Sequence, residues 1–239
     1  MAVTTRAVEY AHGGKTFEGL LAVDSAKTGK RPAVLVSHAW AGRSPGEEDY
    51  AREIAALGYA GFALDLYGKG VLGKTNEECQ ALMTPLVSNR PLLQERLLNV
   101  IEVVKALPEI DASRIAVIGF CFGGLCALDV ARTGADICGA ASFHGLFSAP
   151  GNTKGRKIKA KVIAFHGYDD PMVKPAEIVA LADELTEAGA DWQIHAYGGV
   201  MHAFMNPLAN DPAFGTVYNK RAADRAWKAM TDFLGECFA

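Results

Sequence analysis

The chain has 239 residues, of which 50% are hydrophobic and 21% charged, a composition that suits one globular α/β domain with a large core. The net charge of −3 favours neither a nucleic-acid nor a membrane-surface partner, and no apolar run approaches a membrane span. The start of the chain is polar and strand-like rather than an apolar signal core. Five cysteines without CxxC spacing are typical of free thiols in a reducing cytoplasm, where we expect this protein.

Strand-like and helix-like patterns alternate along the chain, beginning with a hairpin around residues 12–15. The strands are expected at residues 6–11, 16–23, 33–37, 59–64, 115–118, 137–143, 161–165 and 192–197. The helices are expected at residues 46–57, 75–84, 90–106, 125–131, 174–188 and 217–234. This order predicts a mostly parallel central sheet wrapped by helices, in a single domain over residues 1–239, with function at the carboxyl ends of the strands.

A glycine-rich turn separates the strand at 115–118 from the helix that follows it. It reads Gly-Phe-Cys-Phe-Gly-Gly over residues 119–124. A Gly-x-nucleophile-x-Gly turn between a strand and a helix is typical of a nucleophile elbow, and the nucleophile here would be Cys121. The N-terminus of the following helix would favour its thiolate form. The alternative is a buried structural cysteine beside two packing glycines.

A cysteine nucleophile needs a base and an acid that orients the base. Asp170 follows the strand at 161–165, and His202 follows the strand at 192–197. The order nucleophile, acid, histidine is that of the α/β-hydrolase architecture. Asp169 competes with Asp170, which we prefer because Pro171 directly after it restricts the turn.

The other five histidines have structural interpretations. His38 and His144 both end strands near the expected site, and either could contact substrate, but a structural hydrogen-bonding role is favoured for each. A metal ion on these two and His202 would lack a short-spaced ligand pair, so we expect no metal and no other cofactor. Of the remaining three, His12 is expected to be solvated, His195 to fill space within a strand, and His166 to make structural hydrogen bonds.

At these residues the sequence resembles the dienelactone hydrolase family of α/β-hydrolases. The matching pieces include residues 119–124, 166–173 and 202–207, and the likeness spans nearly the whole chain. The cysteine elbow is its most specific part, since most proteins of this fold use serine. The resemblance implies the α/β-hydrolase fold and a hydrolase of small-molecule carboxylic esters or lactones. It also implies a nucleophile, an acid and a base at Cys121, Asp170 and His202.

Two departures from the family pattern bear on activation and substrate. Relatives usually carry a Glu that is thought to hold the resting cysteine protonated, where this chain has Ala39. The cysteine is therefore expected to be permanently activated or differently controlled. The founding members bind a substrate carboxylate with arginines, one of them shortly after the catalytic histidine. Residues 203–207 contain no arginine, so a dienelactone is a less expected substrate here.

The oxyanion of the reaction is expected to bind the backbone N–H groups of Phe122 and Trp40. Aromatic residues in the loops at the same sheet edge favour an apolar cleft, unless they are ordinary core or rim residues. Arg90 is the nearest candidate for binding an anionic group. The candidate pocket residues are His38, Ala39, Tyr67, Arg90, His144 and Phe204.

The residues are also compatible with two other functions. Cys121 could be an oxidation-sensitive thiol in a non-catalytic protein, although a sensor needs no oriented base. An acyl transferase would use the same thioester and differ only in the acyl acceptor. The sequence does not distinguish a monomer from a homodimer.

Overall fold

The computed structural model describes residues 2–239. The contacts group the chain into two compact units, residues 1–117 and 118–239, and the boundary falls inside strand β5 (Ile110–Phe120). The expected single domain stays a prediction, and each unit is described by itself.

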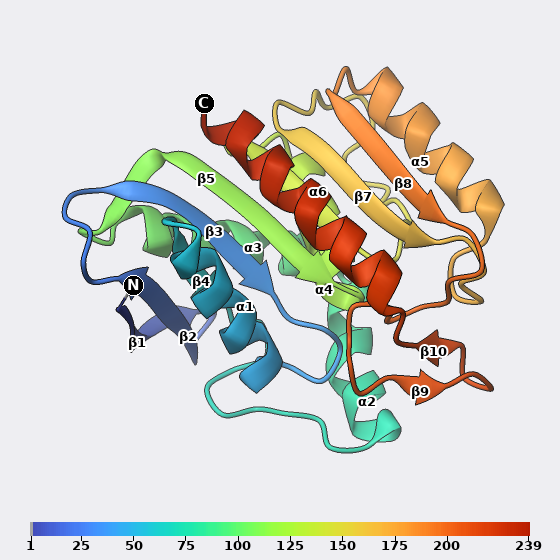
Figure 1. Cartoon of the computed structure of the whole chain (residues 1–239), viewed down its shortest axis with the longest axis horizontal. Helices are drawn as coiled ribbons and strands as arrows, with labels where there is room; N and C mark the ends of the chain where they lie inside the picture. The colour runs from blue at the N-terminus through green and yellow to red at the C-terminus, as the bar shows by residue number, and fades with distance from the viewer. Residues whose placement is uncertain (1) are drawn as a thin grey trace. The chain divides into compact units, whose positions relative to one another are not determined.

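The first unit begins with the hairpin of β1 (Val3–His12) and β2 (Lys15–Asp24), which are antiparallel over their full length. Its strands lie in the order β1-β2-β4-β3-β5 (Figure 1). β2 is antiparallel to β4 (Ala60–Ala63), whereas β3 (Arg31–Ser37) is parallel to it. Every residue of β3 and β4 is buried, as the apolar runs predict for central strands.

Three helices complete the first unit: α1 (Pro45–Ala56), α2 (Asn76–Val87) and α3 (Arg90–Lys105). α1 begins where it does because Ser44 and Glu47 form a capping box and proline occupies the first helical position. α1 packs on β4 so closely that a Cβ on Gly61 would lie 2.0 Å from the Ala51 carbonyl oxygen. The loop after β3 therefore enters α1 along a defined path.

The second unit carries β6 (Gly139–Phe143), β7 (Lys161–Gly167) and β8 (Trp192–Tyr197), all parallel to their neighbours in that order. α4 (Phe122–Arg132) follows the end of β5 and is buried along its whole length. α5 (Pro175–Glu187) packs against β8, and α6 (Lys220–Phe238) lies across β6 and β7 (Figure 1). The parallel strands bring the ends of β6, β7 and β8 to one edge.

All eight predicted strands are present, but the predicted helix at 217–234 was wrong at its start. Residues 216–217 form β10 (Thr216–Val217), which pairs with β9 (Asn210–Asp211). The Asn219 side chain then accepts a hydrogen bond from the Ala222 N–H at 3.0 Å and begins the helix at Lys220. Two-residue strands of this kind have no periodic pattern from which they could be predicted.

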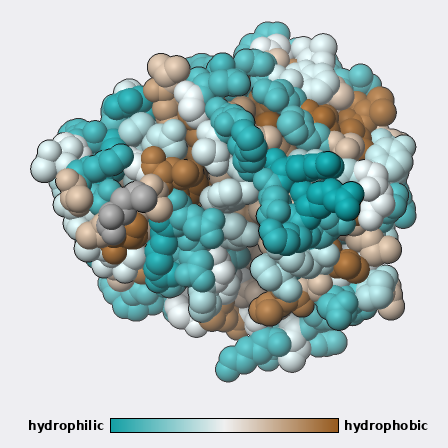
Figure 2. All heavy atoms as spheres, viewed as in Figure 1, coloured by the Kyte–Doolittle hydropathy of each residue, from teal (hydrophilic) through white to brown (hydrophobic). Residues whose placement is uncertain are grey.

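Polar side chains cover most of the face seen in Figure 2, and its apolar residues lie in small, separate groups. Within residues 2–239 no helix combines the length and the hydropathy that crossing a membrane requires.

Candidate active site

Cys121 lies between the end of β5 and the start of α4 in a left-handed backbone conformation, with φ 56° and ψ −116°. A non-glycine residue with positive φ is strained and persists only where its surroundings hold it. The Cys121 N–H donates to the Phe143 carbonyl oxygen at 3.0 Å, and the Cys121 carbonyl accepts from the Gly124 N–H at 2.9 Å. These bonds tie the turn to the end of β6 and to α4. The sulfur is thereby held on a sharp turn, as a nucleophile elbow requires.

Gly119 is required because β5 and α4 approach each other very closely at the elbow. A Cβ at this position would lie 2.1 Å from the Gly123 carbonyl oxygen, which belongs to the backbone and cannot move aside. We expect Gly119→Ala to lower the free energy of unfolding by about 3 kcal/mol, at the upper end of the usual cost of overpacking. Gly235→Ala is a matched control on α6, where nothing lies within 4 Å of the added Cβ and a small stabilisation is expected. Urea unfolding of both variants checks this, and equal stabilities would contradict it.

The second unit brings His202 and Asp170 together. His202 Nδ1 lies 2.6 Å from Asp170 Oδ2, and both side chains are buried. The other carboxylate oxygen, Oδ1, accepts from the Met172 N–H at 2.8 Å, which fixes the orientation of the carboxylate. Asp169 is exposed and its backbone N–H donates to the Val200 carbonyl oxygen, whereas the Asp170 side chain bonds to His202, so the geometry favours Asp170 as the partner.

His202 is electrostatically coupled to Cys121. Burial by itself would lower the pKa of His202, but the charge of Cys121, hydrogen bonds to Asp170 and Cys121, and the charge of Asp170 outweigh it and raise the pKa to about 10. Nε2 makes no well-aligned hydrogen bond within the part of the chain that the structure describes, so its contact with the sulfur is chiefly electrostatic. The raised pKa supports a protonated His202 ring at neutral pH.

The raised pKa of His202 has a measurable consequence. We expect its ring to stay protonated at pH 8 in the native protein and to lose the proton as the pH rises through about 10. The folded pKa lies above the ordinary value of 6.5, so the stabilisation from this proton is complete below 6.5 and is lost as pH rises through about 10. Nitrogen-15 NMR of the imidazole checks this. Cys121→Ala should move the titration to lower pH, and identical curves in both proteins would contradict the coupling.

His144 directly follows β6 and packs edge-on against His202, with ring centroids 5.0 Å apart. The structural hydrogen bonds predicted for its ring are absent within residues 2–239, where neither buried ring nitrogen has a partner. Burial and the charge of His202 hold the pKa of His144 well below its ordinary value, so the ring is neutral. Phe204, fully buried, packs edge-on against the same ring at 5.3 Å. Of these two predicted pocket residues, His144 packs against His202 and Phe204 packs against His144, and contact of either with substrate stays a prediction.

Of the predicted site residues of the first unit, His38 and Ala39 lie in the loop after β3, and Tyr67 contacts that loop. The His38 ring hydrogen-bonds to the backbone through both nitrogens, in agreement with the structural role favoured for it. Tyr67 is buried and its hydroxyl donates to the Trp40 carbonyl oxygen at 3.0 Å. Arg90 begins α3 as a buried residue, not as an exposed cation.

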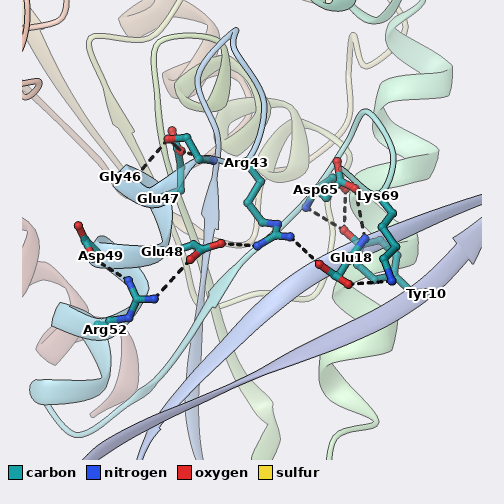
Figure 3. Close-up of polar contacts among 11 residues, drawn as sticks. Tyr10, Glu18, Arg43, Gly46, Glu47, Glu48, Asp49, Arg52, Asp65 and Lys69 are labelled. Atoms are coloured by element: carbon teal, nitrogen blue, oxygen red, sulfur yellow. Dashed lines mark hydrogen bonds and ion pairs between the residues drawn. The ribbon is translucent and has the colours of Figure 1, made fainter. Parts of the chain in front are cut away.

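One contact in this loop was missed by sequence reasoning. The buried Glu47 carboxylate, drawn in Figure 3, accepts from the Ala39 N–H at 3.2 Å. Its position three residues after Ser44 is the signature of a capping box, which predicts the helix start but not the additional bond to the preceding loop.

The sequence model of the dienelactone hydrolase family matches residues 17–238. The chain belongs to the dienelactone hydrolase family. The solved structure of the dienelactone hydrolase-like promiscuous phosphotriesterase P91, from metagenomic libraries, is 33% identical with a TM-score of 0.94 and covers 100% of both chains. The solved structure of m3DLH is 35% identical with a TM-score of 0.93, again over 100% of both chains. The carboxymethylenebutenolidase of Pseudomonas sp. strain P51 is 26% identical over 226 residues, 92% of each chain.

This likeness over the whole chain confirms the predicted α/β-hydrolase fold. Membership of the dienelactone hydrolase family makes the protein a hydrolase of the ester or lactone type. A small-molecule substrate is consistent with this class of enzyme.

Proposed function

We propose that the protein hydrolyses carboxylic esters or lactones through a thioester on Cys121, with His202 as the base and Asp170 as the residue that orients it. The observation that carries the proposal is the arrangement within residues 118–239. A cysteine in the strained turn of an elbow lies beside a histidine whose pKa its charge raises, and that histidine is bonded at 2.6 Å to a buried carboxylate. Each member has the partner that nucleophilic catalysis requires.

In the proposed mechanism His202 carries the proton on Nε2, and the Cys121 sulfur, as its thiolate, forms a bond to the substrate carbonyl carbon. The carbonyl oxygen becomes an oxyanion, which the backbone N–H groups of Phe122 and Trp40 are proposed to bind. Collapse of this intermediate breaks the ester bond, and the leaving alkoxide takes the proton from His202. His202 then removes a proton from water, and the hydroxide attacks the thioester carbonyl carbon. Collapse of the second intermediate breaks the C–S bond, which releases the acid and leaves the Cys121 thiolate beside protonated His202.

The substrate class is tested with a small panel: p-nitrophenyl acetate, a δ-lactone, a dienelactone and a p-nitrophenyl phosphotriester. We expect hydrolysis of the first two. The absence of an arginine in residues 203–207 predicts no preference for the anionic dienelactone. The phosphotriester is included because P91 is named a promiscuous phosphotriesterase. Wild-type protein that turns over no carbonyl compound of the panel would contradict the proposed hydrolase.

Two alternatives make different predictions in the same assays. A thiol sensor would be oxidised by peroxide and would hydrolyse nothing, whereas the bonded Asp170–His202 pair favours catalysis. An acyl transferase would release its product only when an added alcohol or amine accepts the acyl group. The cytoplasmic location remains a prediction.

A further inference from the structure

Two cysteines outside the proposed triad come together where α6 crosses the start of β6. Cys138 directly precedes β6, and Cys237 lies in the last turn of α6, which packs on that strand. A Cβ added to Gly139 would lie 2.5 Å from the Cys237 sulfur, so this sulfur lies within about 4 Å of the Gly139 Cα. Gly139 is bonded to Cys138 and has no side chain, which lets the sulfur lie against the backbone there.

The thiols of Cys138 and Cys237 also interact electrostatically. The pKa of Cys237 is raised to about 12, chiefly by burial and next by the negative charge that Cys138 carries as a thiolate, against the positive charge of Lys161. The Lys161 N–H donates to the Cys138 carbonyl oxygen at 3.1 Å, which ties the backbone of Cys138 to the start of β7. A charge on Cys138 acts on Cys237 in this way because the two groups are close together.

Both thiols are within reach of a small solute. Cys138 and Cys237 are of intermediate exposure, whereas Cys79 and Cys126 are buried. A cysteine that only fills space behaves as a small apolar residue and is usually buried, as those two are. Partly exposed cysteines with a second thiol nearby are typical of redox-sensitive pairs.

We propose that Cys138 and Cys237 form an intramolecular disulfide when the protein reacts with a hydroperoxide. The Cys138 sulfur, as its thiolate, bonds to a peroxide oxygen. The O–O bond breaks, and the leaving oxygen takes up the proton that Cys138 released, which gives an alcohol, or water from hydrogen peroxide. The Cys237 sulfur then attacks the sulfenic acid sulfur on Cys138, the S–O bond breaks, and hydroxide leaves as water with the Cys237 proton. Two thiols are oxidised to one disulfide, and one peroxide is reduced.

The surroundings of the two sulfurs determine the order of these steps. The raised pKa of Cys237 makes its thiolate scarce at neutral pH, so Cys138 is assigned the first step. Oxidation converts the Cys138 thiolate to an uncharged sulfenic acid, which removes the charge that opposes ionisation of Cys237. The bond joins the start of β6 to the last turn of α6 and closes a loop of about 100 residues, which restricts the unfolded chain.

The test maps the disulfides of wild-type protein after treatment with hydrogen peroxide. Remaining thiols are blocked, and trypsin without reductant places Cys138 in residues 133–154 and Cys237 in residues 229–239, apart from the other cysteines. We expect these peptides to be linked in protein of monomer mass, and the link to disappear on reduction. The midpoint of thermal unfolding should rise by about 5 to 10 °C in the oxidised protein. Unlinked peptides under conditions that oxidise Cys121, or a link between two copies of the chain, would overturn the proposal.

Two serine variants and one control test the individual steps. In Cys237→Ser the reaction should stop at a sulfenic acid on Cys138, which dimedone traps, whereas in Cys138→Ser we expect Cys237 to stay reduced. Cys121→Ala should form the bond as the wild type does. A sulfenic acid on Cys237 in Cys138→Ser, or loss of the bond in Cys121→Ala, would contradict the proposed reaction. If a serine variant does not fold, the wild-type peptide map decides, and none of these readouts depends on ester hydrolysis.

Discussion

Replacing Cys121 with alanine is expected to lower kcat/KM for p-nitrophenyl acetate by at least about 10³-fold, because the attacking atom is removed. Folding should be little affected, since the side chain is only partly buried and makes no capping hydrogen bond. Cys121→Ser should also retain little activity, because His202 would have to deprotonate an alcohol, a far weaker acid than a thiol. The measurement is steady-state kinetics on each variant, with thermal unfolding to verify the fold.

Cys138→Ala provides the matched control for this experiment. Cys138 is a cysteine of similar, intermediate exposure in the same unit and lies outside the proposed triad. Its substitution should leave kcat/KM within about twofold of wild type, as for most substitutions away from a site. Unchanged hydrolysis in Cys121→Ala would refute the assignment of the nucleophile, whatever the control shows.

Asp170→Asn is expected to lower kcat by about 10²- to 10⁴-fold, the range that follows when the acid of a triad becomes an amide. The carboxylate is buried, bonds to His202 Nδ1 at 2.6 Å and helps to raise the pKa of His202. An amide at this position supplies no negative charge and no longer fixes which imidazole nitrogen carries the proton. We therefore expect the titration of His202 to move to lower pH as well.

Asp169→Asn is the control for the acid, because this neighbouring carboxylate is exposed, whereas His202 Nδ1 bonds to Asp170. It should retain at least about half of the wild-type kcat, as most exposed positions do. The comparison is decisive in either direction. A larger loss in Asp169→Asn than in Asp170→Asn would assign the acid to Asp169.

The fold could be predicted to a large extent because its signals are periodic. The strand at residues 192–197 was located to the residue, and α1 to within one residue at each end. Elements without periodicity were beyond prediction, as β9 and β10 illustrate. The strand before the elbow begins at Ile110, earlier than predicted. Its first part was not predicted because residues 110–114 are polar or exposed for most of their length and lack the pattern of a buried strand.

The triad could be proposed from the sequence because the chain order of its loops follows from the sheet topology. The choice of Asp170 over Asp169 rested on Pro171, and the structure brings Asp170 to His202. Side-chain orientation is what the sequence could not predict. Nothing in it distinguishes His38, with both nitrogens bonded to the backbone, from His144, whose strained backbone (φ 37°) places an unbonded ring against His202.

The central claim is a covalent thioester on Cys121, and intact-protein mass spectrometry tests it most directly. Wild-type protein is mixed with excess p-nitrophenyl acetate and quenched in acid within the first turnovers. We expect one added acetyl group that maps to the peptide containing Cys121, decays as substrate is exhausted, and is absent in Cys121→Ala. Turnover by the wild type with no adduct at any quench time, or an acetyl group that persists in Cys121→Ala at the same rate, would contradict it.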